Sequence, residues 1–221
     1  YFLIFIYNYL PVKDLGLAVI TITVIIRFVL YPISKKALES QRTLQKLQPK
    51  LSEIQKKYKD NKEQQTKEVL ELYRKEKINP FSGLFLVIVQ IPILIALYKL
   101  FLDVLKPEEL TNLYSFVLTP TSINSLFLNI VDLAKPNLIF AVIAGIIQFF
   151  QTKTITPPSL KNQTQDKSFN AIMQKQMLYF FPVITVIILL TLPSALGLYW
   201  IVSGLFSIIQ QYFIFKKEPN L

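Results

Sequence analysis

The sequence predicts an all-α, polytopic membrane protein in which five transmembrane helices surround a polar cavity and a helical hairpin joins two of them. Hydrophobic residues make up 52% of the 221 residues and aromatic residues 13%, a composition that favours a membrane protein over a soluble domain. Several apolar runs are about as long as a membrane span requires. By contrast, residues 35–79 are polar and rich in lysine. The first long apolar run contains a charged residue, and because a charge is costly in lipid, this residue predicts a polar cavity.

The composition excludes several classes of function. The chain contains no cysteine and no histidine, which removes disulfides, zinc sites built from these residues, thiol nucleophiles and imidazole bases. A Ser-Lys or paired-carboxylate hydrolase would need a lysine or an acid deep within a span, and the predicted spans offer neither. We therefore expect no metal, no cofactor and no enzymatic activity. The net charge of +10 is concentrated in particular segments, so it does not predict a specific nucleic-acid partner.

The predicted chain begins with a short apolar helix and the charged span. Residues 1–11 are too few to cross a bilayer and predict an interfacial amphipathic helix. The first span, residues 12–34, contains Arg27, and an arginine at the centre of a span costs ~2.5–3.5 kcal/mol on insertion scales. Thr23, Arg27 and Tyr31 are four residues apart, so on one helix their side chains stack on one face. We interpret this face as a polar stripe in a wet cavity.

Two alternatives for Arg27 remain open at this point. The side chain could extend to the membrane interface, or it could form an ion pair with a structural partner. Extension is disfavoured because the basic flank at Lys35 lies about 12 Å further along the helix at ~1.5 Å per residue.

Residues 35–79 predict a basic helical hairpin. Thirteen Lys and Arg residues stand there against seven acids. Apolar side chains recur along the first leg at the spacing of a coiled-coil seam, at Leu44, Leu47, Leu51, Ile54 and Tyr58. Residues 59–62 predict a turn to a second helix, and Pro49 should kink the first leg. The hairpin is either a solvated connector lying on anionic lipid or a docking arm for a partner protein.

Four further spans complete the predicted topology. In chain order they occupy residues 80–102, 136–153, 177–193 and 194–215. The connections are an extracytoplasmic loop at 103–135, a polar loop at 154–176 and a tail at 216–221. Apolar clusters in the first of these loops, such as residues 126–128, predict short interfacial helices. The second span should bend at Pro92, and the third and fourth spans are short enough to thin the bilayer.

The distribution of basic residues predicts the orientation. When the hairpin, the loop at 154–176 with its border and the C-terminus are placed on one side, that side holds 19 of the 24 Lys and Arg residues. The positive-inside rule then places these segments in the cytoplasm. The N-terminal residues are expected outside and the C-terminus inside.

Besides Arg27, the predicted spans contain several other polar side chains. They are Gln90, Gln148, Tyr199, Trp200, Ser203, Ser207 and Gln210. Tyr199, Ser203 and Gln210 fall near one face of the last helix and could form a wall opposite Thr23 and Arg27. For each Gln or Ser the alternative is an ordinary interhelical hydrogen bond. Because no acid lies deep in a span, Arg27 is expected to meet water or a visiting acidic ligand.

Three segments resemble a known family. They are Ile78-Asn79-Pro80 running into VIVQIPILIALYKL, the earlier LQKLQPKLSEIQKKYKDN, and the late QMLYFFPVITVIILLTLPSALGLYWIVSGLFSIIQQYFI. These segments are similar to the YidC family of bacterial membrane protein insertases, which is related to the mitochondrial and thylakoid insertases. The resemblance spans nearly the whole chain. It implies five spans around a hydrophilic groove that opens to the cytoplasm and lipid, and a cytoplasmic helical hairpin needed for activity.

The resemblance also implies roles for individual residues. The essential groove arginine of the family matches Arg27, and its polar groove positions match Thr23, Gln148 and Trp200. With Tyr199 and Ser203 from the polar wall, these residues form the predicted substrate-binding groove. Within the residues given, no large extracytoplasmic domain precedes the first span, which differs from Gram-negative members and leaves open what precedes Tyr1. The residues given also lack a long basic C-terminal tail, which leaves ribosome docking through a tail an open question.

The predicted function is that of a membrane protein insertase and chaperone in the bacterial plasma (inner) membrane. It would move short hydrophilic tails or loops of newly made membrane proteins across the bilayer and release their apolar segments into lipid. The ribosome and the Sec translocon are further candidate partners. Two other functions remain open: a small anion transporter or channel that uses Arg27, and an assembly scaffold that inserts nothing. A transporter would be favoured by an inverted repeat, and the sequence has none.

Overall fold

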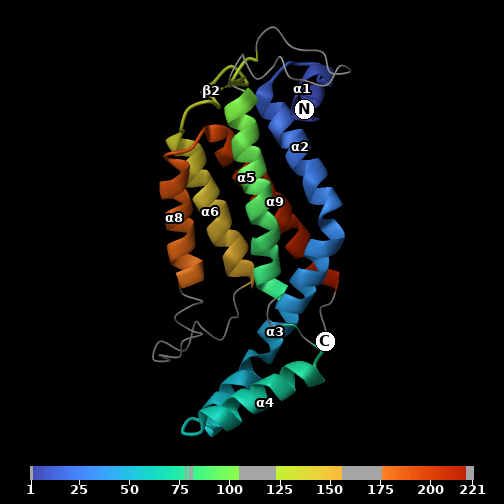
Figure 1. Ribbon diagram of the computed structural model, residues 1–221, viewed down its shortest axis with the longest axis vertical. Helices are drawn as coiled ribbons and strands as arrows, with labels where there is room; N and C mark the ends of the chain where they lie inside the picture. Colours follow the sequence, from blue (N-terminus) through green and yellow to red (C-terminus); the bar gives the residue numbers. More distant parts are fainter. Residues whose placement is uncertain (1, 78, 80–81, 105–122, 156–175, 218–221) are drawn as a thin grey trace.

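The described residues form a bundle of helices, and a helical hairpin projects from one end of it (Figure 1). The computed structural model describes residues 2–77, 79, 82–104, 123–155 and 176–217. Its elements are α1 (Phe2–Tyr9), α2 (Leu15–Val29), α3 (Tyr31–Lys57), α4 (Lys62–Lys75), α5 (Ser82–Val104), β1 (Leu126–Phe127), β2 (Val131–Asp132), α6 (Leu138–Ile155), the π-helical turn η3 (Gln176–Phe180), α8 (Phe181–Leu189) and α9 (Ser194–Lys217). The all-α prediction is confirmed.

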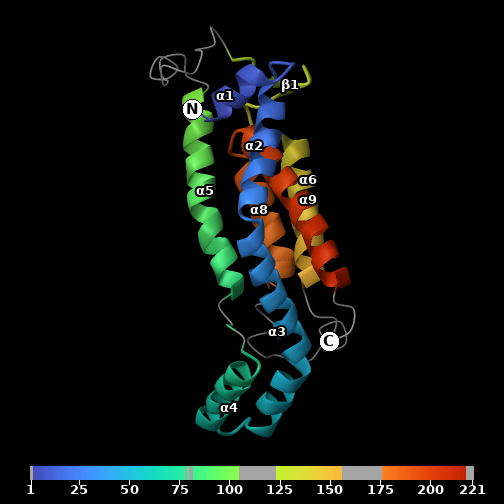
Figure 2. The same cartoon turned by 90° about the vertical axis from the view of Figure 1, so that its right-hand side faces the viewer.

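Helices α2 and α3 are two parts of one long stretch that bends by 64°. Pro32 lies in the first turn of α3, where its missing N–H and its ring prevent α2 from continuing straight through Leu30. Beyond the bend, α3 runs without interruption into the hairpin (Figure 2). The boundary expected between the first span and the hairpin, at residues 34–35, therefore lies inside a continuous helix.

The hairpin is closed by a short turn between α3 and α4. Asn61 caps α4, because its side-chain oxygen accepts from the backbone N–H of Gln64 at 3.0 Å. Leu47 and Leu51 are buried, as the seam predicts. Lys50 and Glu76 then join the two legs by an ion pair at 3.2 Å.

Helices α6, α8 and α9 pack closely at positions where side chains are small. A Cβ atom added at Gly145 of α6 would lie 2.5 Å from Val186 Cγ2 on α8. One added at Gly204 of α9 would lie 2.5 Å from Ile147 Cγ2 on α6. Because apolar burial gives little driving force between helices in lipid, close backbone approach of this kind is a main source of their association.

The end of the bundle opposite the hairpin carries an antiparallel pair of short strands, β1 and β2 (Figure 1). The short interfacial helices expected around residues 126–128 were therefore a wrong prediction. Leu128 and Asn129 have positive φ angles of 51° and 58°, which form a tight turn that a helix cannot contain. The turn is held in place because the Leu128 N–H donates to Asp14 Oδ2 at 2.7 Å.

The strand pair is tied to the bundle on both sides. Phe127 packs on α2 at Gly16, where any added Cβ would overlap its ring. Ser194, at the start of α9, donates to the Asp132 carbonyl oxygen at 3.0 Å. The Ser125 hydroxyl, which donates to the Asp132 carboxylate at 2.8 Å, helps to hold the pKa of Asp132 below its usual value. This end of the molecule is thus fastened by polar contacts.

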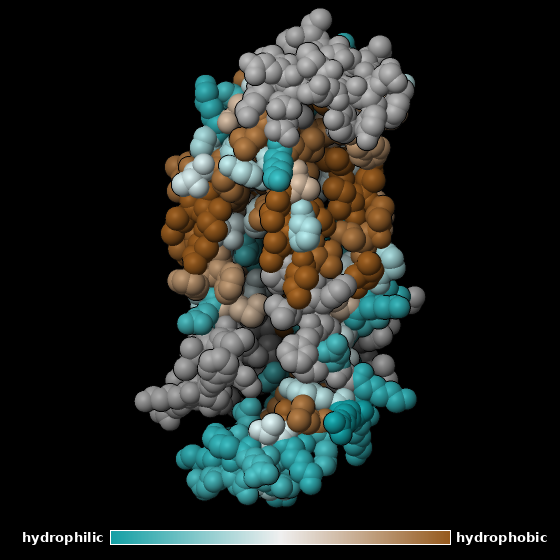
Figure 3. All heavy atoms as spheres, viewed as in Figure 1, coloured by the Kyte–Doolittle hydropathy of each residue, from teal (hydrophilic) through white to brown (hydrophobic). Residues whose placement is uncertain are grey.

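The apolar surface fits a membrane protein. On the face that Figure 3 shows, hydrophobic residues cover much of the middle of the bundle, and the hairpin below it is largely hydrophilic. Among the described residues, Leu138–Ile155 and Ser194–Lys216 are long and apolar enough to span a bilayer, and the bent pair α2–α3 is a third candidate. Ile88–Leu102 and Gln176–Leu189 are shorter apolar helices. The count of five spans and their boundaries stay predictions, and the loop at 156–175 lies outside the described residues.

A candidate polar site around Arg27

Arg27 lies in the last turn of α2 and is half-buried. Its Nη2 donates to Gln90 Oε1 on α5 at 3.5 Å. The Gln90 Nε2 in turn donates to the hydroxyl of Tyr199, a buried residue of α9. One chain of polar contacts thus connects the arginine to two other helices of the bundle.

The charge of Arg27 has no counter-charge among the described residues. The ion pairs found there join Lys35 to Glu39, Lys50 to Glu76 and Lys135 to Asp132, and none includes Arg27. Gln90 supplies a neutral amide oxygen at the outer limit of hydrogen-bond distance. A half-buried cation held in this way is open to attraction by an anion.

Thr23 and Tyr31 do not extend the arginine into a continuous stripe. Thr23 is 0% exposed, and its hydroxyl donates to the Val19 carbonyl oxygen of its own helix at 2.6 Å. Tyr31 lies beyond the bend between α2 and α3, so it does not share a straight helix face with Arg27. The predicted stripe assumed an unbroken helix, which Pro32 prevents.

The polar wall predicted on α9 is buried in the bundle. Its members are Tyr199, Ser203, Ser207 and Gln210. Gln210 donates to Ser34 Oγ at 2.8 Å and to the Tyr31 carbonyl oxygen at 3.4 Å, so it joins α9 to α3. For Gln210 the structural alternative, an interhelical hydrogen bond, is the one observed.

Several buried polar atoms have no hydrogen-bond partner within the described part of the chain. They include Gln148 Oε1 on α6, Ser203 Oγ on α9, and both side-chain polar atoms of Gln211 on α9. Gln211 is 0% exposed. A buried polar group without a partner costs about 1–3 kcal/mol, so these atoms are suited to binding water or a polar segment.

The structure brings together only part of the predicted site. Arg27 and Tyr199 are linked through Gln90, whereas no described contact links Gln148, Trp200 or Ser203 to Arg27. Trp200 is half-buried, and its ring meets that of its neighbour Tyr199 edge-on at 6.4 Å.

Sequence reasoning left Gln90 and Gln211 out of the site. Gln90 belongs to the QIP segment that carried the family resemblance, and Gln211 follows Ser207 by one helical turn. The QIP segment and the helical spacing from Ser207 could therefore have pointed to these two residues. The contact between Arg27 and Gln90 could not be predicted from the sequence, because the two residues are 63 positions apart.

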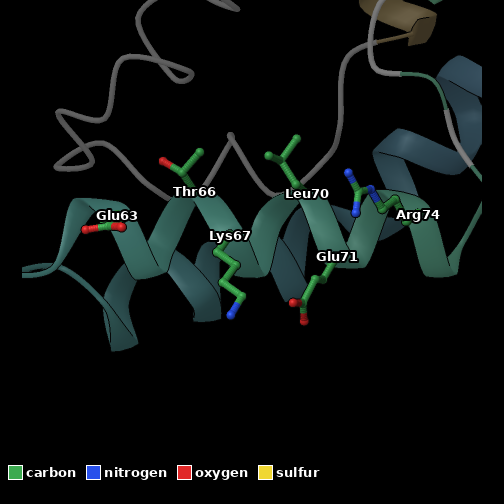
Figure 4. Close-up of a pocket in the computed structure, with 6 residues that line it drawn as sticks. All are labelled: Glu63, Thr66, Lys67, Leu70, Glu71 and Arg74. Carbon is green, nitrogen blue, oxygen red and sulfur yellow. The ribbon is translucent and has the colours of Figure 1, made fainter.

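A hollow lies on α4 of the hairpin, away from the arginine. It has a volume of about 510 Å³ and is lined by Glu63, Thr66, Lys67, Leu70, Glu71 and Arg74 (Figure 4). All six residues belong to α4, and their charges balance. No cluster of acids suited to a metal ion occurs in the part of the chain that the structure describes.

These features define a class of protein: an all-α membrane protein with an uncompensated arginine among polar side chains inside its bundle. The sequence model of the family described as 60Kd inner membrane protein matches residues 5–220. The chain therefore belongs to this family, and the resemblance found in the sequence is confirmed.

Relatives in several bacteria are named membrane protein insertase YidC. The protein of Fusobacterium nucleatum is 33% identical over 206 residues, which cover 93% of this chain and 88% of the relative. The protein of Wigglesworthia glossinidia brevipalpis is 36% identical over 212 residues, covering 96% of this chain. That of Geobacter metallireducens is 35% identical over 215 residues, again covering 96% of this chain. The chain spans 35% of the length of each of the last two relatives.

Proposed function

We propose that the protein is a membrane protein insertase whose substrates enter a hydrophilic groove at Arg27. The observation that carries the proposal is the half-buried guanidinium, whose described hydrogen-bond partner is the neutral amide of Gln90. Membership of the family, with relatives named as insertases, supports the same reading. The groove would accept a hydrophilic tail or loop of a newly made membrane protein.

Charge and burial supply the energetics of this proposal. At an effective dielectric constant of ~20, two opposite unit charges ~4 Å apart attract by about 4 kcal/mol, against about 1 kcal/mol in bulk water. Arg27 therefore attracts an acidic segment more strongly within the bundle than a surface arginine would. The apolar segment of the substrate then partitions into lipid, at about 25 cal/mol per Å² buried. No covalent bond is made or broken, so the protein acts without enzymatic chemistry.

The buried polar atoms of α6 and α9 extend the proposed groove. Gln148, Ser203 and Gln211 each have hydrogen-bonding capacity that no described residue uses. In the groove these atoms bind water or the peptide groups of the passing segment. Tyr199, Trp200 and Thr23 belong to the proposed groove as well, and the rings of Tyr199 and Trp200 meet edge-on.

The orientation belongs to the proposal as well. The hairpin and the C-terminal end of α9 lie at the same end of the molecule in Figure 1, and α1 lies at the other. This arrangement agrees with the positive-inside count, which places the hairpin in the cytoplasm of a bacterial cell and the N-terminal residues outside. The hairpin is then the surface that first meets substrates, the ribosome or a Sec translocon.

Insertion into proteoliposomes tests the proposal. Purified protein is reconstituted with a short single-spanning substrate that has an acidic tail, and protease protection reports the translocated tail. Arg27→Ala should reduce protection about ten- to a hundredfold, since a hydrogen bond to a charged group is worth about 1.5–3 kcal/mol. Arg27→Lys should retain much of the activity if charge matters more than guanidinium geometry.

Lys99→Ala is the matched control, because it removes one positive charge from an exposed position on α5. It should insert the substrate normally. If the wild type inserts the substrate and Arg27→Ala inserts it equally well, the groove charge has no role in insertion. Wild-type vesicles that pass small anions but protect no tail would favour a transporter, and vesicles that do neither would favour a scaffold.

A further inference from the structure

Gln90 occupies the place at which the acid of an ion pair would be expected. Its Oε1 accepts from Arg27 Nη2 at 3.5 Å, and no carboxylate of the described residues is paired with this arginine. A carboxamide oxygen accepts a hydrogen bond but carries no net charge. The arginine is therefore held in position while its charge stays uncompensated.

The orientation of Gln90 is set from the other side by Tyr199. A carboxamide has an acceptor oxygen on one side and a donor nitrogen on the other. The nitrogen donates to the hydroxyl of Tyr199, a residue that is 2% exposed on α9. Because Nε2 is held there, Oε1 is directed toward Arg27.

A carboxylate can replace the Gln90 amide as the hydrogen-bond acceptor of Arg27. The bond to Gln90 is a single bond to a neutral acceptor, and its length lies at the limit for a hydrogen bond. A guanidinium has five N–H donors. Within the described part of the chain, Arg27 uses one of these donors, in its bond to Gln90. An incoming carboxylate could accept two parallel, shorter, charge-assisted bonds from the same group.

We propose that Gln90 is a specificity-determining residue of the groove: its neutral amide fills the position on Arg27 that a substrate carboxylate takes. The inference rests on the proposed insertase function. The favoured substrates are hydrophilic tails or loops that contain Asp or Glu. An acid at position 90 would form a permanent ion pair with Arg27 and exclude the substrate acid.

The test compares two tails in proteoliposomes. One substrate carries an acidic tail, and the second carries the same tail with each Asp and Glu replaced by Asn and Gln. The measured quantity is the ratio of acidic-tail to neutral-tail insertion, which cancels general losses of activity or folding. The variants are Gln90→Glu, which is nearly isosteric, and Gln90→Met, which is neutral and apolar. Lys99→Glu is the control, because it adds an acid at an exposed position of the same helix.

Gln90→Glu should lower the ratio about tenfold or more, whereas Gln90→Met and Lys99→Glu should not lower it. A ratio in Gln90→Glu equal to that of the wild type would overturn the proposal. An equal fall in Gln90→Met would also overturn it, because the amide would then be needed merely for structure. If Gln90→Glu inserts neither tail, the Gln90→Met ratio decides alone. Failure of the wild type to insert either tail would instead refute the insertase function.

Discussion

Asp14 joins the start of α2 to the strand pair β1–β2, and its loss should destabilise both. Its Oδ1 accepts from the backbone N–H of Leu17 at 3.0 Å, and its Oδ2 from that of Leu128 at 2.7 Å. The residue is 5% exposed. Both bonds are therefore largely shielded from water, which strengthens them.

The two bonds determine the size of the effect. Loss of an N-cap costs about 0.5–2 kcal/mol, and loss of a hydrogen bond to a charged group about 1.5–3 kcal/mol. Asp14→Ala removes both, so the free energy of unfolding should fall by about 2–5 kcal/mol. Asp14→Asn keeps one of the two acceptor oxygens, and we expect roughly half of that loss.

Unfolding by SDS in mixed micelles, followed by circular dichroism, measures these differences. Asp60→Ala is the control, since Asp60 is an exposed acid in the hairpin turn. Asp14→Ala should unfold at a lower SDS fraction than the control, with Asp14→Asn between the two. If Asp14→Ala and Asp60→Ala agreed within about 0.5 kcal/mol, the carboxylate would not tie α2 to the strand pair.

Three further predictions concern packing, pH and the hairpin. Gly145→Ala places a Cβ 3.2 Å from the Pro182 carbonyl oxygen of α8, so the same SDS titration should show a loss of about 1–3 kcal/mol; unchanged stability would refute the close contact. The folded-state pKa of Asp132 is lowered by the Ser125 hydrogen bond, so the stability that it contributes is present above its ordinary pKa of 3.8 and is lost as the pH falls through the folded value. An acid titration should show this loss in the wild type and not in Asp132→Asn, and identical curves would contradict it. Deleting residues 56–67 should impair insertion in cells, whereas normal insertion would reduce the hairpin to a connector.

The helices were predictable because local signals specify them. Asn61 at the hairpin turn supplies its own cap, and the seam leucines Leu47 and Leu51 follow the helical period. The lack of an acidic partner for Arg27 could also be predicted, because no Asp or Glu lies deep within a predicted span. These features depend on residues close together in the chain.

The remaining features depend on contacts between distant residues or on weak turn signals. The turn at Leu128 and Asn129 has no glycine, so its positive φ angles left little trace in the sequence. The position of Gln90 between Arg27 and Tyr199 requires three helices to be packed first. Sequence patterns identified the polar residues but not which of them meet.

The proposed groove requires that water from the cytoplasm reach Arg27. The chain contains no cysteine, so single cysteines can be introduced directly and labelled with a membrane-impermeant maleimide. Arg27→Cys and Trp200→Cys should be labelled from the cytoplasmic side alone, because a thiol reacts as the hydrated thiolate. Ile95→Cys, at an exposed apolar position of α5, should be labelled from neither side. Failure of Arg27→Cys to react from either side, or its labelling from outside, would contradict a groove that opens to the cytoplasm.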